Sequence, residues 1–223
     1  MDYSVTLEHG SDGTYLAWVH ELPGCFFRGP SREDVLARLP AEIRDFLAWL
    51  QRSGEAVEEG AINVVVVEEV ESIVQASEDS EALVQTDREP LTHEDWVKIE
   101  RWLAHSRLDL LERLSNLPDE GLESRPQRSA RTLREEVVHI AFVELMYAAW
   151  TFDLRTREGL QQFLEWTRSV ALGRMRFLAE SDDGSITYAE WAGAPRPEEW
   201  SARKAGRRLI WHELLHLRSL HRR

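Results

Sequence analysis

The segment Trp200–Arg223, WSARKAGRRLIWHELLHLRSLHRR, decides the expected fold of the C-terminal half of the chain. It contains no proline and a single glycine, so a helix from about Ala202 to the end is expected, with Ser201 as its N-cap. His212 and His216 are four residues apart. On a helix this spacing places two imidazoles one turn apart on one face, where both can reach one metal ion.

The letters of His212 to His216 also match the HExxH motif of zinc peptidases. We do not expect a peptidase, because those enzymes usually take a third ligand downstream and seven residues follow His216 in this sequence. Glu213 lies about 100° around the helix from His212, which favours a structural role for it. An isolated histidine pair can also bind nothing, so a third histidine matters.

Three further segments show the helical spacing of apolar residues, over about 92–116, 132–152 and 156–180, where Ser129 or Thr132 could cap the second. Four long amphipathic helices with little else predict an up-and-down four-helix bundle over residues 91–223.

His139 lies within the second of these helices, and its neighbours at helical spacings are apolar, so we expect it to face the bundle interior. Together with His212 and His216 it would form a His₃ site that leaves room for water or substrate, the ligand count of an open catalytic metal site. Glu144 could orient a ligand histidine or act as a base, or could form an ion pair with an arginine; the sequence leaves both open.

The C-terminal half resembles the DinB/YfiT-like family of metal-binding helix bundles. The residues that carry the resemblance are Leu133–Ala141 with Glu144, Trp200–Lys204 and Trp211–Leu217. The resemblance implies that His139, His212 and His216 bind a divalent metal, zinc or nickel. It also implies thiol-dependent transferase or isomerase chemistry on a small molecule, with a low-molecular-weight thiol.

The first 75 residues predict a small α+β domain of order β-β-β-α-β. Alternating or β-branched runs predict four strands, and Ser31 begins a helix with acids in its first turn. The expected strands are Tyr3–Leu7, Thr14–His20, Cys25–Phe27 and Ile62–Val70, and the helix runs to about Leu50. Cys25 is expected to be a small buried hydrophobic residue and not a nucleophile.

This domain resembles the HicB-like, antitoxin-type family, which has a partial ribonuclease-H-like fold. The matching features are Tyr3–Val5, Asp12–Tyr15, Glu21–Cys25, Gly29, Ser31 and Phe46–Leu50. In that family a DNA-binding segment often follows, and nothing like one follows here. Residues 76–90 are acidic and poor in bulky side chains, so we interpret them as a linker and domain boundary.

The net charge of −13 is concentrated in the N-terminal part, where residues 1–75 hold 14 acidic and 5 basic side chains. This charge disfavours nucleic-acid binding there. The basic side chains of the last helix are explained mostly by its C-terminal dipole and solvated face. No apolar run approaches the length of a membrane span, and a single cysteine with no visible signal segment favours a cytoplasmic protein.

The sequence therefore favours a metal-dependent enzyme. It could be a thiol-dependent transferase or isomerase, or it could be a hydrolase, and the sequence assigns no catalytic residue. The alternative is a non-enzymatic binding or regulatory protein that engages a protein partner through its acidic HicB-like domain. A DNA-linked repressor is disfavoured on charge. A homodimer is compatible with either hypothesis.

Overall fold

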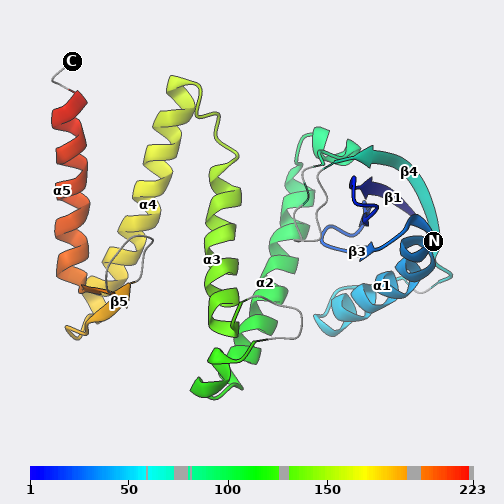
Figure 1. Ribbon diagram of the computed structural model, residues 1–223, viewed down its shortest axis with the longest axis horizontal. Coiled ribbons are helices and arrows are strands. Elements are labelled where there is room, and N and C mark those ends of the chain that lie inside the picture. The colour runs from blue at the N-terminus through cyan, green and yellow to red at the C-terminus, as the bar shows by residue number, and fades with distance from the viewer. Residues whose placement is uncertain (59, 73–79, 81, 126–130, 190–196, 221–223) are drawn as a thin grey trace. The chain divides into compact units, whose positions relative to one another are not determined.

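The computed structural model describes residues 1–58, 60–72, 80, 82–125, 131–189 and 197–220. The chain forms two compact units, Met1–Asp119 and Glu120–Arg223 (Figure 1). Parts of three predictions lie outside the described residues, namely residues 76–79 and 81 of the linker, Ser129, and the last three residues of the final helix.

The first unit contains the expected β-β-β-α-β order. Its elements are β1 (Asp2–His9), β2 (Tyr15–Val19), β3 (Phe26–Gly29), α1 (Arg32–Arg52) and β4 (Asn63–Glu71), followed by the short 3-10 helix η1 (Gln85–Arg88) and by α2 (His93–Ser115). The strand order is β3-β2-β1-β4, in which only the β1–β4 pair is parallel. A parallel pair requires a crossover connection, and α1 lies within it.

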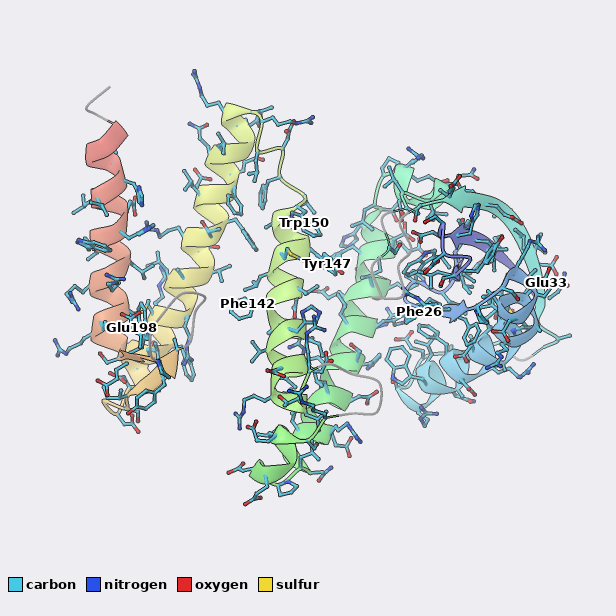
Figure 2. The ribbon with its side chains drawn as sticks, in the orientation of Figure 1. Phe26, Glu33, Phe142, Tyr147, Trp150 and Glu198 are labelled. Atoms are coloured by element: carbon cyan, nitrogen blue, oxygen red, sulfur yellow. The ribbon has the colours of Figure 1, made fainter. Side chains whose placement is uncertain are left out.

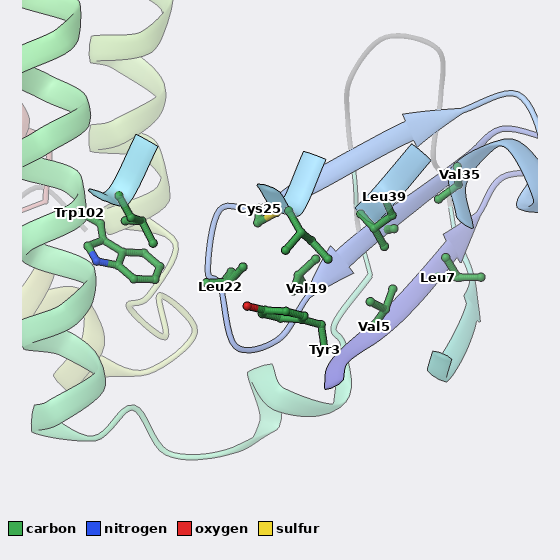
Figure 3. Close-up of a cluster of buried hydrophobic side chains, with 12 residues drawn as sticks. Tyr3, Val5, Leu7, Val19, Leu22, Cys25, Val35, Leu39 and Trp102 are labelled. Carbon is green, nitrogen blue, oxygen red and sulfur yellow. The ribbon is translucent and has the colours of Figure 1, made fainter. Parts of the chain in front are cut away.

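The hydrophobic core of this unit lies between the sheet and α1 (Figure 3). Tyr3, Val5 and Leu7 alternate along β1 and point to one face of the sheet. The buried stripe of α1 has helical spacing and consists of Val35, Leu39, Ile43 and Leu50. Ser31 caps this helix, since its Oγ accepts a hydrogen bond from the backbone N–H of Asp34 at 3.2 Å, as predicted.

Polar side chains gather on the other face of the sheet. The β1–β4 register shifts by one residue between Val5 and Thr6, so Val5 lies opposite Val66 and Thr6 opposite Glu68. This bulge brings Glu68 to the side of the sheet where Thr6 lies, and Thr6 Oγ1 donates to Glu68 Oε2 at 2.8 Å. Thr6 and Glu8 are both fully buried.

The described part of the predicted linker is bound to this polar face. Ser80 Oγ donates to Glu8 Oε2 at 2.6 Å and the backbone N–H of Ala82 donates to Glu8 Oε1 at 3.3 Å. The backbone N–H of Gln85 donates to Glu68 Oε2 at 2.9 Å, and Val84 is buried. These described residues of the predicted linker are therefore held against the sheet by hydrogen bonds. The domain limits drawn from the sequence remain a prediction.

The helical region contains the four expected helices, α2, α3 (Leu133–Ala149), α4 (Arg157–Ser181) and α5 (Ala202–Leu220). Their limits agree with the predicted ones to within a few residues. A second 3-10 helix, η2 (Asp119–Glu123), and two short paired strands, β5 (Thr187–Ala189) and β6 (Glu198–Trp200), were not expected. None of the helices in the described residues combines the length and apolar character needed to cross a membrane.

The second unit holds α3, α4 and α5, and its described residues do not form the close-packed core of a bundle. No side chain of α3 is buried, and Gly159 is the only buried residue of α4. Phe142, Tyr147 and Trp150 project from α3 and are more than 60% exposed (Figure 2). The structure therefore shows that this region is helical, and the packing of its helices as a four-helix bundle remains a prediction.

Candidate metal centre

The start of α5 is fixed by a cap and by contacts to β6. Ser201 Oγ accepts a hydrogen bond from the backbone N–H of Lys204 at 3.2 Å, which confirms the predicted N-cap. Lys204 Nζ forms an ion pair with Glu198 at 2.8 Å and lies 4.8 Å from the ring centroid of Trp200. Figure 2 shows Glu198 at this end of the helix. These contacts set the first turn, and the histidines follow two turns later.

His212 and His216 lie on one face of α5, as the spacing predicted. Their Nε2 atoms are 3.2 Å apart, and the rings meet edge to face with centroids 4.5 Å apart. Two histidine nitrogens bound to a tetrahedral zinc ion at about 2.0–2.1 Å lie about 3.3 Å from each other. The pair is therefore already close to the separation that two ligands of one metal ion require.

Glu213 points away from this pair and contacts α4. Its carboxylate forms an ion pair with the guanidinium of Arg168. Met175 lies 3.5 Å from where a side chain at Gly206 would begin, so α4 and α5 also contact each other nearer the start of α5. The structural role predicted for Glu213 is confirmed. No local sequence signal identified Arg168, because the pairing depends on how α4 and α5 align.

His139 lies near the middle of α3, whose start is fixed by a capping box. Thr132 Oγ1 accepts from the backbone N–H of Glu135 at 3.2 Å, and Glu135 Oε2 accepts from the backbone N–H of Thr132 at 2.7 Å. The side chains of His139, His212 and His216 are all exposed, whereas the sequence suggested that they face inward. Among the described residues, no three histidine, cysteine, aspartate or glutamate side chains come together as a metal site. The structure thus brings together two of the three predicted ligands.

Comparison with known families decides the class of the helical region. The family model of the DinB superfamily matches residues 102–220, which is just over half of the chain. The chain belongs to the DinB superfamily. The match begins in α2 and ends with α5, so all four helices of the region contribute to the DinB-like part.

The N-terminal part is similar to a second group of proteins. The UPF0150 protein Ta0767 of Thermoplasma acidophilum is 32% identical over 57 residues, which cover 26% of this chain and 83% of that protein. This similarity supports the HicB-like character predicted for the first domain. No solved structure matches the chain.

Within the DinB-like part, α3 differs from its neighbours in having almost no polar face. From Val137 to Trp150 only His139 and Glu144 are strongly polar. A helix that is apolar on all sides is normally covered on all sides. His139 therefore lies on the helix whose surface is the most apolar and which we expect to be covered by other helices. Glu144 is exposed on the same helix, and both roles considered for it remain open.

Cys25 behaves as the buried hydrophobic residue that was predicted. It is 2% exposed within the core of the first unit. Burial, with a smaller contribution from the negative charge of Glu42, raises the pKa of its thiol to about 12. A thiol with so high a pKa is almost wholly protonated at neutral pH and is a poor nucleophile or metal ligand.

Proposed function

We propose that residues 91–223 pack as an up-and-down four-helix bundle that binds a divalent metal ion through His139, His212 and His216. The observation that carries the proposal is the separation of 3.2 Å between the Nε2 atoms of His212 and His216, which suits two ligands of one ion. Membership of the DinB superfamily is compatible with a metal-binding, enzyme-like fold.

Zinc or nickel is the metal we propose, because neutral imidazole nitrogens suit both ions. Three protein ligands leave at least one coordination position for a small molecule. When bound there, the metal would stabilise the anion of a thiol or of water. The histidines would hold and orient the ion, and Glu144 would either orient His139 or pair with an arginine elsewhere.

The reaction class that fits such a site best is thiol-dependent transfer or isomerisation of a small molecule, with hydrolysis as the second choice. Both use a nucleophile that is weak when protonated and that a cationic centre activates. We also propose that the protein acts in the cytoplasm, where the single buried cysteine would remain reduced.

Metal content tests this proposal. The protein would be purified without a histidine tag and analysed by emission spectroscopy, before and after incubation with zinc or nickel. We expect about one ion per chain in the wild type and a clear loss in His212→Ala. Wild-type protein that holds no metal and cannot be loaded would rule the proposal out.

A second function, binding of a protein partner by the N-terminal domain, is favoured by its exposed apolar side chains. Trp18 and Phe26 form a ring pair with centroids 5.9 Å apart, and Phe26 is 54% exposed. Val65 and Val67 of the edge strand β4 are also exposed, in a region of strongly negative charge. We expect a basic partner captured at low salt and released as salt rises. Unchanged capture by Phe26→Ser would argue against this surface.

A further inference from the structure

The sheet of the first unit ends on one side in a long strand whose outer edge is open. The strand order is β3-β2-β1-β4, so β3 and β4 are the two edge strands (Figure 1). A short edge strand is poorly suited to pairing with another chain, and β3 has four residues, whereas β4 has nine. Among the described residues, no strand pairs with the side of β4 that faces away from β1. A further strand can therefore be added at β4.

Hydrogen bonds at the two ends of β4 show which of its backbone groups face outward. The N–H of Asn63 donates to the carbonyl oxygen of Met1 at 2.9 Å, so Asn63 faces β1. Just past the strand, the N–H of Ser72 donates to the carbonyl oxygen of His9 at 3.0 Å, so Ser72 also faces β1. Backbone groups of successive strand residues point alternately to the two sides. The two residues are an odd number of positions apart, and the one-residue shift in the β1–β4 register accounts for the odd step.

Counting inward from each end identifies the open groups. In the first half of the strand the N–H and C=O groups of Val64 and Val66 face away from β1, and in the second half those of Glu69 and Glu71 do so. None of these four backbones bonds a loop or turn of the described residues. We call these outward-facing groups of Val64, Val66, Glu69 and Glu71 the open edge. Such a row of donors and acceptors is a template for another strand.

The side chains of β4 provide little of the protection that edge strands usually have. The strand reads NVVVVEEVE, with neither the lysine nor the proline that commonly blocks pairing. Val64 and Val66 pack against the core, so Val65 lies on the other face of the sheet, where it is 39% exposed. Val67, next to the register shift, is 47% exposed. A run of exposed and half-buried valines of this kind favours pairing with a further strand.

Charge determines which kind of chain fits this edge. Glu69 forms an ion pair with Arg32 at 2.7 Å, and Glu71 is exposed two residues further on the same face of the sheet. Like charges placed opposite each other across two strands are destabilising, and opposite charges are stabilising. Residues 1–75 hold 14 acidic and 5 basic side chains, so a second copy of this domain is repelled. A strand with basic side chains is attracted.

We infer that β4 binds an extended, basic segment of another protein by strand addition. The open edge hydrogen-bonds the main chain of that segment, and the basic side chains lie beside Glu69 and Glu71. Apolar side chains at the alternate positions lie beside Val65, on the other face of the sheet. The inference rests on the proposed partner binding by the N-terminal domain, but it places the contact on β4 and not at Trp18 and Phe26, which belong to β2 and β3.

Peptide binding to the full-length protein tests the inference. The probe is a fluorescent nine-residue peptide in which lysine and valine alternate, and fluorescence anisotropy at low salt measures its affinity. Val64→Pro removes one outward N–H, and an edge strand tolerates proline where that group faces solvent. Val64→Ala keeps the N–H and is the matched control. We expect Val64→Pro to weaken binding by at least about fivefold, the contribution of one backbone hydrogen bond, and Val64→Ala by less than about twofold.

A second pair of variants tests the charge and does not depend on proline. Glu71→Lys reverses a charge at the open edge, whereas Glu100→Lys makes the same change at an exposed position of α2. We expect Glu71→Lys to weaken binding of the lysine–valine peptide by at least about threefold at low salt, and Glu100→Lys to have less effect. A peptide with glutamate in place of lysine should not bind the wild type.

The outcomes distinguish the open edge from the surface around Phe26. Loss of binding in Val64→Pro and Glu71→Lys, with normal binding in Phe26→Ser, supports the inference even if partner capture through Phe26 fails. Binding that only Phe26→Ser abolishes would overturn the inference and leave that partner surface standing. Wild-type protein that binds neither peptide, or both equally, would overturn it as well. So would a wild-type dimer in sedimentation velocity that Val64→Pro converts to a monomer, because a second copy would then occupy the open edge.

Discussion

The Nε2 atoms of His212 and His216 face each other at 3.2 Å across one turn of α5. At that separation one ring nitrogen donates a hydrogen and the other accepts it. A metal ion between the two rings would take both nitrogen lone pairs in place of this hydrogen bond. Replacing the hydrogen bond by a metal ion needs little movement of the helix, since two nitrogen ligands of a tetrahedral zinc ion lie about 3.3 Å apart.

Removal of either histidine should therefore weaken zinc binding strongly. We expect His216→Ala to lower the affinity by more than the roughly 10- to 100-fold that loss of an outer-shell partner typically costs. Competition with a chromophoric chelator measures this affinity. His93→Ala, which removes an exposed histidine at the start of α2, is the matched control and should bind like the wild type. Equal affinities for the two variants would show that the pair is not part of the site.

The contact between the N-terminal domain and α2 should weaken in acid. Hydrogen bonds from Arg101, and more weakly from His105, lower the pKa of Glu55 from 4.5 to about 2 in spite of its partial burial. A group whose pKa is depressed by folding contributes stability above its ordinary pKa and loses it as the pH falls. The contribution of Glu55 is therefore complete above about pH 4.5 and disappears towards pH 2.

Tryptophan fluorescence provides the measurement, because Trp49 and Trp102 both lie at this contact. In the wild type the emission should shift between pH 4.5 and 2, and in Glu55→Gln the shift should be reduced. An identical titration in both proteins would contradict the role assigned to this carboxylate.

The buried carboxylate of Glu8 should be important for the stability of the first unit. Burial raises the pKa of this group, but hydrogen bonds from Ser72, Ser80, Trp18 and the backbone of Ala82 outweigh that effect and lower it. In Glu8→Gln, at least one of these donors faces an amide N–H₂ group. We expect a loss of roughly 1–3 kcal/mol in the free energy of unfolding, measured with urea.

The control for this prediction is Glu71→Gln, which alters an exposed acid on β4 and should change stability by less than about 0.5 kcal/mol. A similar small effect for Glu8→Gln would mean that Ser80 and Ala82 are not held by this carboxylate.

The first turn of α4 requires glycine at position 159. A Cβ atom there would collide with the backbone oxygen of Asp153, and backbone cannot move aside cheaply. We expect Gly159→Ala to destabilise the protein by roughly 1–3 kcal/mol, as other overpacked sites do. Gly173→Ala in the same helix meets no atom within 4 Å, and it should stabilise by up to about 1 kcal/mol. Thermal unfolding followed by circular dichroism compares the two, and equal effects would contradict this account of the turn.

The parts of the fold that follow local rules were predictable. Ser31 and Ser201 were expected as caps, and Thr132 was one of two candidates for a third; each accepts the hydrogen bond that a cap should accept. The spacing of His212 and His216 likewise brought their side chains together, because four residues make one turn.

Contacts between residues far apart in the sequence were not predictable. Residues 76–90 were interpreted as a linker from their acidity, yet Ser80 and Gln85 bind Glu8 and Glu68 on the sheet. Nothing local to Glu55 indicates Arg101 as its partner, 46 residues later. The meeting of His139 with the histidine pair is a contact of the same kind, between two helices, and it remains a prediction.

X-ray absorption at the metal edge of the full-length, metal-loaded protein tests the central claim most directly, because it counts the imidazole nitrogens around the ion. We expect three such ligands in the wild type and in His93→Ala, and two in His139→Ala with the metal still bound by His212 and His216. The same imidazole count in the wild type and in His139→Ala would contradict the proposed site.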